Sequence, residues 1–335
     1  MIGIMKPAGL RSVQITGLGK HFPQRKLTNA DLEKMVDTSD EWITSRTGMK
    51  ERYITGPDEP TSSLAIPAAR QALANAGVAP GQIDLIIVAT VTPDMFFPAT
   101  ACLVQAALGA KRAACFDLEA ACPQFIYACA VGSQFIATGT YDCVLVIAAD
   151  TLSKITNWED RNTCVLFGDG AGAAVLQPGP EGRGFLSFVL GSDGTEGDLI
   201  SIPAGGSRCP ASPESVAHHL HTIHMNGNEV FKFAVRIIPD AVLESLSKAG
   251  LGPENIDLLI PHQANLRILE AARKRLALPK SKVFINIEKY GNFSGATCPV
   301  ALAEAVEQGL VKEGSVVVLV TFGAGLTWAA CTLRW

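Results

Sequence analysis

One pattern of helix, turn and strand occurs twice in this chain of 335 residues. Residues 68–87 and 241–260 match without a gap. Each contains a Gly-x-x-Pro turn, then Ile-Asp-Leu, then further apolar residues. Self-similarity over a long spacing indicates a repeated structural unit. We therefore expect two similar halves, residues 1–178 and 179–335, with the strongest candidates for function divided between them.

The order of the predicted elements indicates the fold class. Strand candidates alternate with helix candidates, which is typical of mostly parallel sheets with helices on both faces. The expected strands are 13–18, 83–89, 113–118, 143–149, 171–176, 258–260, 283–285, 316–321 and 328–333. The expected helices are 28–36, 39–47, 62–76, 99–108, 122–138, 228–249, 264–276 and 297–308. The turns 167–170 and 322–325, both beginning Phe-Gly, add a second repeated feature. Two similar α/β halves favour a functional site at their junction.

Composition excludes several classes of protein. With 48% hydrophobic and 18% charged residues, the chain is too apolar to be disordered. A net charge of −4 argues against a nucleic-acid partner, which requires a basic surface. No apolar run reaches the roughly 18–20 residues of a membrane span, and no signal-peptide pattern is present. The nine cysteines are odd in number and include no Cys-x-x-Cys pair, so we expect reduced thiols and a cytoplasmic location.

Cys122 is the first candidate for catalysis. It follows a predicted strand, and the apolar run after it predicts a buried helix that begins at Cys122, with Pro123 in the first turn. A helix N-terminus directs free N–H groups and positive dipole at such a thiol, which lowers its pKa and makes it a nucleophile. The alternative interpretation is a small residue that fills the corner between strand and helix.

His262 and Asn292 occupy comparable positions. His262 follows the strand candidate 258–260, and ligands bind at strand ends in α/β sheets. Asn292 follows Gly291 just before a helix of small residues. Taken singly, His262 also fits a structural histidine, and Asn292 fits a turn. Together with Cys122 they form one set of polar groups at strand-to-helix junctions.

With these three residues in view, the chain resembles the thiolase-like condensing enzymes, and among them β-ketoacyl-acyl carrier protein synthase III, from about residue 13 to residue 335. The matching motifs are DEWI with RTG (40–48), AAC (120–122), FGDGAG (167–172), GNEVF (227–231), PHQAN (261–265), GN with Ser (291–294) and FGAG (322–325). The resemblance implies a thiolase-like five-layered α-β-α-β-α fold of two duplicated halves. It also implies a homodimer.

The same resemblance implies a reaction that needs no cofactor. An acyl group, with acetyl as the first expectation, passes from acyl-CoA to Cys122, and malonyl-acyl carrier protein then loses CO₂ and condenses with it. A thiolate suits this transfer because the acyl-enzyme remains an activated thioester. His262 and Asn292 would donate to the enolate oxygen, since fixed donors stabilise developing charge. The backbone N–H groups of Cys122 and Ala324 would hold the tetrahedral intermediate, and Phe322 would shield the site.

Substrate contacts are implied in the same way. Trp42 would stack on the adenine of coenzyme A, with Arg46 and Arg161 near the nucleotide and Asn228 along the pantetheine arm. The stretch 264–282 contains six basic residues and one acid. A solvated helix face is the usual interpretation of such a run, but in an acidic chain it also suits an acidic partner. The residues expected to bind the acyl carrier protein are Arg267, Lys274 and Arg275.

The acyl pocket is where the sequence departs from the family. Phe97 is expected to reach across the dimer into the partner's acyl pocket. Departures from the family pattern fall at Pro123, Gln124, Phe293, Gly295, Ala324 and Leu326. None removes a catalytic group, so they leave the choice of acyl chain open rather than the type of reaction.

Two other functions remain open. One is a related acyl-CoA condensing or acyl-transfer enzyme of secondary metabolism. The other is a Cys-His thioester hydrolase, which the apolar helix behind Cys122 disfavours.

Four histidines crowd together in the C-terminal half. They are His218, His219, His221 and His224. His219 and His221 would share one face of a strand and invite a metal. No nearby cysteine completes a ligand set, so we expect no metal site.

Overall fold

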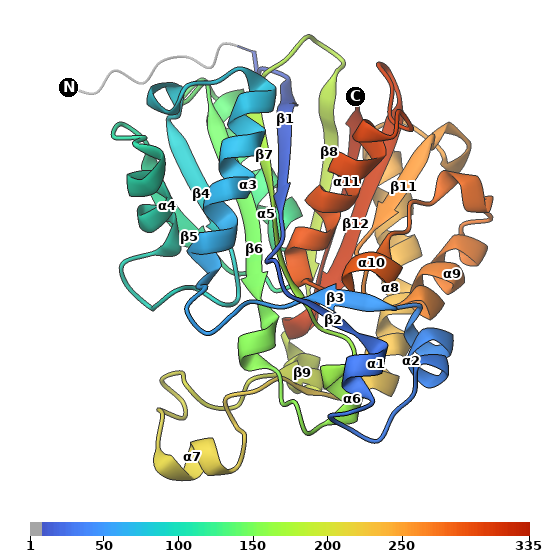
Figure 1. The fold of residues 1–335 in the computed structure, drawn as a ribbon. Coiled ribbons are helices and arrows are strands. Elements are labelled where there is room, and N and C mark those ends of the chain that lie inside the picture. Colours follow the sequence, from blue (N-terminus) through green and yellow to red (C-terminus); the bar gives the residue numbers. More distant parts are fainter. Residues whose placement is uncertain (1–8) are drawn as a thin grey trace.

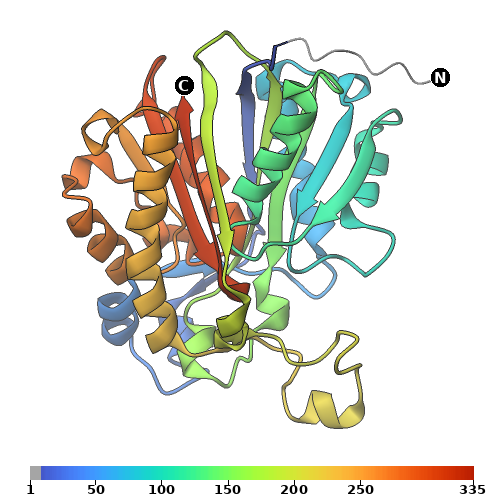
Figure 2. The same cartoon turned by 180° about the vertical axis from the view of Figure 1, so that it is seen from behind.

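Two sheets run through the molecule, with a helix layer between them and another outside each (Figures 1 and 2). The structure is a computed structural model that describes residues 9–335. The first sheet is ordered β1 (Val13–His21), β7 (Asp169–Pro178), β6 (Val144–Thr151), β4 (Leu85–Ala89) and β5 (Ala114–Leu118). The second is ordered β8 (Gly184–Ser192), β13 (Thr327–Arg334), β12 (Val316–Gly323) and β11 (Leu258–Pro261).

Six helices complete five layers. The outer face of the first sheet is covered by α3 (Thr61–Ala76) and α4 (Thr100–Leu108), and that of the second by α8 (Gly227–Lys248) and α9 (Leu266–Arg275). Between the sheets lie α5 (Gln124–Ala137) and α11 (Thr297–Glu307). Strands β4, β6, β11 and β12 are buried at every residue, which suits sheets with helices on both faces. The expected five-layered α-β-α-β-α fold is confirmed.

The two sheets repeat one topology. The order β8-β13-β12-β11 reproduces β1-β7-β6-β4. In each half an aspartate before a strand accepts from the backbone at the start of the neighbouring strand: Asp84 from Cys143 N–H at 3.0 Å, and Asp257 from Val316 N–H at 2.8 Å. Asp84 and Asp257 lie 173 positions apart, and so do Cys143 and Val316, which is the spacing of the sequence repeat. The duplication is therefore present in structure, while the division at residue 178 stays a prediction.

Some expected elements differ. The counterpart of β5 is only an isolated bridge between Leu259 and Val283, so the expected strand 283–285 is wrong. Strand β8 was not predicted, because its short apolar core is flanked by Gly184 and Gly191 and reads as loop. Helix α1 spans only Asn29–Leu32. The remaining elements are α2 (Asp40–Thr47), α6 (Arg161–Cys164), α7 (Pro213–Ala217), α10 (Ile287–Tyr290), β2 (Lys26–Thr28), β3 (Glu51–Tyr53), β9 (Ile200–Ser201) and β10 (His224–Met225).

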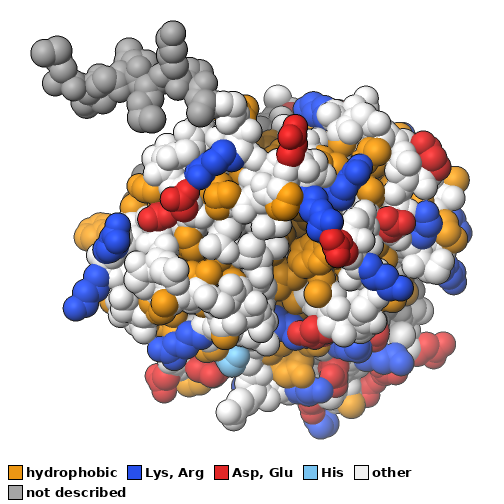
Figure 3. Space-filling model, turned by 90° about the horizontal axis from the view of Figure 1, so that it is seen from above, with side chains coloured by type: hydrophobic (Ala, Val, Ile, Leu, Met, Phe, Trp, Pro, Cys, Tyr) orange, Lys and Arg blue, Asp and Glu red, His pale blue; other side chains and the backbone are white. Residues whose placement is uncertain are grey.

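The surface mixes charges of both signs. Figure 3 shows basic and acidic side chains interspersed over the face seen from above. Within residues 9–335, none of the helices has the length and apolar character needed to cross a membrane.

Candidate active site

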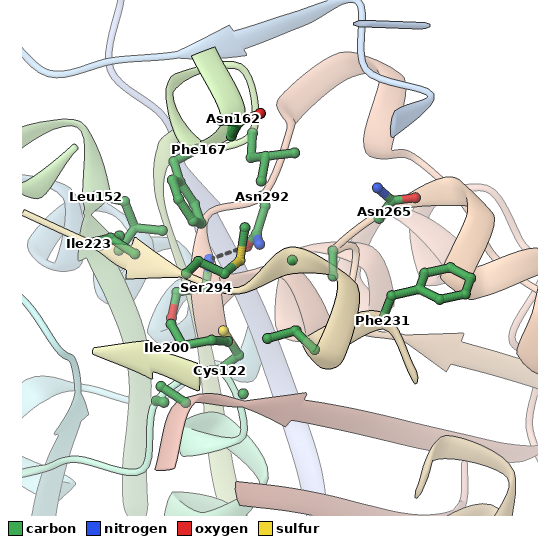
Figure 4. A pocket seen from close by; sticks show the side chains of 18 of the residues that line it. Cys122, Leu152, Asn162, Phe167, Ile200, Ile223, Phe231, Asn265, Asn292 and Ser294 are labelled. Atoms are coloured by element: carbon green, nitrogen blue, oxygen red, sulfur yellow. Dashed lines mark hydrogen bonds between the residues drawn. The ribbon is translucent and has the colours of Figure 1, made fainter. Parts of the chain in front are cut away.

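A cavity of about 990 Å³ opens where the two halves meet. Figure 4 shows it from close by, with Cys122, Asn292 and Ser294 among its walls. Its lining includes most residues that the sequence singled out: Trp42, Arg46, Cys122, Asn228, His262, Arg267, Asn292, Phe322 and Ala324. Arg161, Lys274, Arg275 and Phe97 do not line it. The structure thus brings the three candidate catalytic groups to one space, and their chemical roles stay predictions.

Cys122 lies in the sharp turn between β5 and α5. The turn passes through Ala121, whose φ of 49° is in the left-handed region. Helix α5 begins at Gln124, not at Cys122 as predicted, because Pro123 stands at the N-cap and its carbonyl accepts from Tyr127 N–H at 3.1 Å. The thiol is therefore just outside the helix N-terminus.

The expected lowering of the Cys122 thiol pKa is wrong. Desolvation raises the pKa of Cys122 to about 12, the negative charge of Asp150 adds to the rise, and a hydrogen bond from Ser294 opposes it. Asp150 ends a run of buried apolar residues in β6 and is itself fully buried. Desolvation in the assembled cavity is thus the largest influence on this thiol, and it opposes the lowering expected from the helix N-terminus.

Close backbone approach fixes the turn that faces Cys122. A Cβ atom on Gly323 would lie 2.7 Å from Cys122 N and 2.9 Å from Pro123 Cδ, so only glycine fits. Thr327 Oγ1 donates to Ala120 O at 3.1 Å and ties β13 to the same turn. Ala324 lies next to Gly323 and lines the cavity with Cys122.

Asn292 is held by its own backbone and by the first half. Its N–H donates to Leu166 O and its C=O accepts from Gly168 N–H, both at 2.9 Å. Its Oδ1 accepts from Ser294 N–H at 2.9 Å, dashed in Figure 4. With the acceptor end occupied, the carboxamide NH₂ is left to donate into the cavity.

The Phe-Gly turns act across the junction of the halves. The turn at Gly168 in the first half holds Asn292 of the second, and the turn at Gly323 in the second half abuts Cys122 of the first. Each Phe-Gly turn, the second repeated feature of the sequence, therefore contacts a candidate catalytic residue of the other half.

His262 follows β11 and is only 2% exposed. Burial lowers the pKa of its imidazole to about 3, so the ring is neutral at physiological pH. Its Nδ1 lies 2.6 Å from the hydroxyl of Thr297, and that hydroxyl oxygen accepts from Gln263 N–H at 3.4 Å. Among the described residues, Nδ1 is the only acceptor that faces the buried Thr297 hydroxyl, so we assign the hydroxyl proton to this bond and the ring proton to Nε2. Phe322 packs edge-on against His262, with ring centroids 5.9 Å apart.

Sequence reasoning assigned no role to three supporting residues, of which only Ser294 was part of a recognised motif. Thr297 orients His262, while Ser294 and Asp150 lie beside Cys122. Asp150 had a usable signal, since an aspartate at the end of an otherwise apolar strand is unusual. Thr297 had none, because many helices begin with threonine.

The ring of Trp42, which lines the cavity, lies close to two arginine guanidinium groups. Trp42 on α2 is partly exposed. The guanidinium carbons of Arg46 and Arg161 lie 4.8 and 4.3 Å from its ring centre. The Nη1 atom of Arg161 also lies 3.6 Å from Oδ2 of Asp37. Trp42 therefore presents an aromatic ring with two positive charges beside it at the cavity.

The basic residues expected to bind the acyl carrier protein, in the stretch 264–282, differ in their surroundings. Arg267 lies 5.6 Å from the ring of Phe231 at the cavity. Lys274 is exposed, whereas Arg275 pairs with Asp240 at 3.2 Å.

The histidine cluster does not form the predicted shared strand face. His218 ends α7, His219 follows in a turn, and His221 Nε2 lies 2.8 Å from Ser215 Oγ. His224 Nε2 lies 3.2 Å from the carbonyl of His219. Among the described residues, no group of three or more potential ligands could hold a metal ion.

A cysteine that faces a neutral histidine and an asparagine, at the junction of two repeated halves in five layers, defines a thiolase-like condensing enzyme. Family models agree: residues 116–194 match "3-Oxoacyl-[acyl-carrier-protein (ACP)] synthase III", and residues 246–335 match its C-terminal model. The chain belongs to the β-ketoacyl-acyl carrier protein synthase III family, acyltransferases that perform the initiating condensation of fatty acid synthesis.

Whole-chain comparisons support this assignment. The β-ketoacyl-acyl carrier protein synthase III of Symbiobacterium thermophilum is 62% identical over 326 residues, covering 97% of this chain and 99% of that protein. The enzyme of Caldanaerobacter subterraneus is 59% identical, covering 96% and 97%. The crystal structure of the Aquifex aeolicus synthase III has a TM-score of 0.90 at 47% identity, covering 97% and 100%.

Proposed function

We propose that this chain transfers an acyl group from acyl-CoA to Cys122 and condenses it with malonyl-acyl carrier protein, giving 3-oxoacyl-acyl carrier protein, CoA and CO₂. The observation that carries the proposal is the meeting of Cys122, His262 and Asn292 on one cavity. Family membership supports the same reaction.

The first half-reaction needs only the thiol. The sulfur of Cys122 attacks the thioester carbonyl, the carbon–sulfur bond to CoA breaks, and the thiol proton leaves on CoA. The step is balanced in protons, because the Cys122 thiol loses the proton that the CoA thiol gains. Backbone N–H groups of Cys122 and Ala324 hold the oxyanion, which Gly323 allows by letting the two turns approach.

The second half-reaction needs the two donors. The carbon–carbon bond to the malonyl carboxylate breaks, CO₂ leaves, and charge develops on the thioester oxygen. Nε2–H of His262 and the carboxamide NH₂ of Asn292 stabilise this enolate. The enolate carbon then attacks the acyl-enzyme carbonyl, and Cys122 departs and regains a proton. A neutral histidine is required here, and its burial supplies it.

Substrate binding follows the cavity. Trp42, Arg46 and Arg161 bind the nucleotide of CoA, and Asn228 lies along the pantetheine arm. Arg267 and Lys274 bind the carrier protein, and Arg275 contributes after release from Asp240. Apolar side chains line the wall near Cys122 and suit a short acyl chain: Leu152, Phe167, Ile200 and Ile223.

A homodimer would complete the acyl pocket. Phe97 is 86% exposed and its neighbours Phe96 and Met95 are 83% and 48% exposed. Such a run of exposed apolar side chains marks an interaction surface. We propose that Phe97 enters the pocket of a second copy. A monomeric protein in sedimentation experiments would contradict this.

The direct test combines acyl-CoA with malonyl-acyl carrier protein and follows CO₂ release and the 3-oxoacyl product. Cys122→Ala should abolish acyl transfer and with it the 3-oxoacyl product, while Cys209→Ala, a change at a partly buried cysteine away from the cavity, should not. A panel of acyl-CoAs, with the acyl mass read on the Cys122 peptide, identifies the primer. Full product formation by Cys122→Ala would contradict the proposal.

A further inference from the structure

Gln124 lies where the catalytic elements meet. It is the first residue of α5, two positions after Cys122, and it is fully buried. Its Nε2 donates to Asp150 Oδ2 at 2.6 Å, whereas its Oε1 has no partner among the described residues. A buried amide with one unsatisfied end costs stability, so packing alone favours an apolar residue at this position.

The acceptor of this hydrogen bond belongs to the surroundings of the thiol. Asp150 on β6 also accepts from Val91 N–H at 2.8 Å and from Thr90 Oγ1 at 3.0 Å. Ser294 lies near both groups, since its side chain lowers the pKa of the Asp150 carboxyl and of the Cys122 thiol. Asp150, Ser294 and Gln124 therefore form one polar network behind Cys122.

The side chain of Gln124 also packs on the asparagine turn. A Cβ atom on Gly295 would lie 2.5 Å from Gln124 Cγ and 2.9 Å from its Nε2. Gly295 directly follows Ser294, whose N–H holds the carboxamide of Asn292. Two departures from the family sequence pattern, at positions 124 and 295, are thus the two sides of one contact.

We propose that Gln124 is a positioning residue that fixes Cys122, Asp150 and the Asn292 turn relative to one another. This inference rests on the proposed function, since it concerns the geometry of the condensation step. Gln124 does not line the cavity, so it acts through Ser294 and Asn292 rather than on substrate. Its loss should slow the chemical step without weakening the binding of the malonyl thioester.

The experiment is a double-mutant cycle of Gln124→Ala and Gly295→Ala. Gln124→Ala removes the atoms that a Cβ at 295 would meet but leaves the helix intact. Small displacements of catalytic groups cost up to about 100-fold in rate, so we expect kcat of condensation to fall about 10-fold, with KM for the malonyl thioester within about threefold of wild type. Gln134→Ala, an exposed glutamine of the same helix, is the matched control.

Coupling between the two sites decides the result. Gly295→Ala should be harmful in the wild-type background and nearly neutral in Gln124→Ala, both in kcat and in the melting temperature. Equal cost in both backgrounds, or a Gln124→Ala enzyme indistinguishable from Gln134→Ala, would overturn the inference. The melting-temperature cycle needs no activity, so failure of the wild-type enzyme to condense would count against the proposed function alone.

Discussion

Thr297→Val tests how the imidazole of His262 is set for donation. The substitution keeps the shape of a fully buried side chain and removes the hydroxyl that lies 2.6 Å from His262 Nδ1. It removes two hydrogen bonds, the one to His262 Nδ1 and the longer one that the hydroxyl accepts from Gln263 N–H, but leaves the Nε2 donor in place. A net hydrogen bond is worth about 0.5–1.5 kcal/mol, which is up to about tenfold in rate. Complete loss of an oxyanion donor costs about 10²–10³-fold, so this variant should lie between wild type and His262→Ala.

The assay separates the two half-reactions. Decarboxylation of malonyl-acyl carrier protein by acylated enzyme should fall about tenfold. Acyl-enzyme formation, followed by the mass of the Cys122 peptide, should change less than about twofold, because His262 has no assigned role in it. Thr297→Ser retains the hydroxyl and serves as the control. Decarboxylation at the wild-type rate in Thr297→Val, or an equal loss in both half-reactions, would refute the tautomer assignment.

Three further outcomes follow from the site. In Gly323→Ala the added Cβ would press against Cys122 N and Pro123, so both half-reactions should be lost and the free energy of unfolding should fall by about 1–3 kcal/mol. The control is Gly81→Ala, because a Cβ at Gly81 would meet no other atom. A stable, active Gly323→Ala would contradict the close approach. The Cys122 pKa of about 12 predicts that iodoacetamide alkylation of this cysteine, followed by mass, keeps accelerating beyond pH 9, and a plateau below pH 9 would contradict it. Because burial lowers the pKa of His262 from 6.5 to about 3, unfolding takes up a proton and stability is lost as pH falls from 6.5 toward 3. In His262→Gln, the free energy of unfolding measured by denaturant titration should fall less over that pH range than in wild type. An equal fall in both proteins would exclude His262 as the source of this pH dependence.

The sequence predicted two similar halves because local residues specify the repeat, whereas the five layers followed from the family resemblance. Glycine, proline and aspartate at matched spacing specify the same turn twice, and Asp84 and Asp257 make the same backbone contact in each half. Cys122 and His262 also have local signals, since each follows a strand of one of the sheets and precedes a helix. The predicted strand-to-helix junction is wrong for Asn292, which follows helix α10. Those signals need no knowledge of long-range packing.

What the sequence could not predict depends on contacts between distant segments. The contact between Gln124 and Gly295, or between His262 and Thr297, joins parts of the chain that no local pattern relates. The thiol pKa was predicted in the wrong direction because the helix terminus is visible in sequence, whereas the desolvation that opposes its effect comes from the assembled cavity. Strand β8 was also missed because its position depends on a distant segment, its partner strand β13.

The central claim is that Cys122 acts in both half-reactions while Asn292 acts in one. The most direct measurement uses Asn292→Ala with acyl-CoA alone and then with malonyl-acyl carrier protein. We expect the acyl mass to appear on the Cys122 peptide at near the wild-type rate, and CO₂ release to fall by about 10²–10³-fold. Loss of acylation to the same extent as CO₂ release would contradict the assigned division of labour.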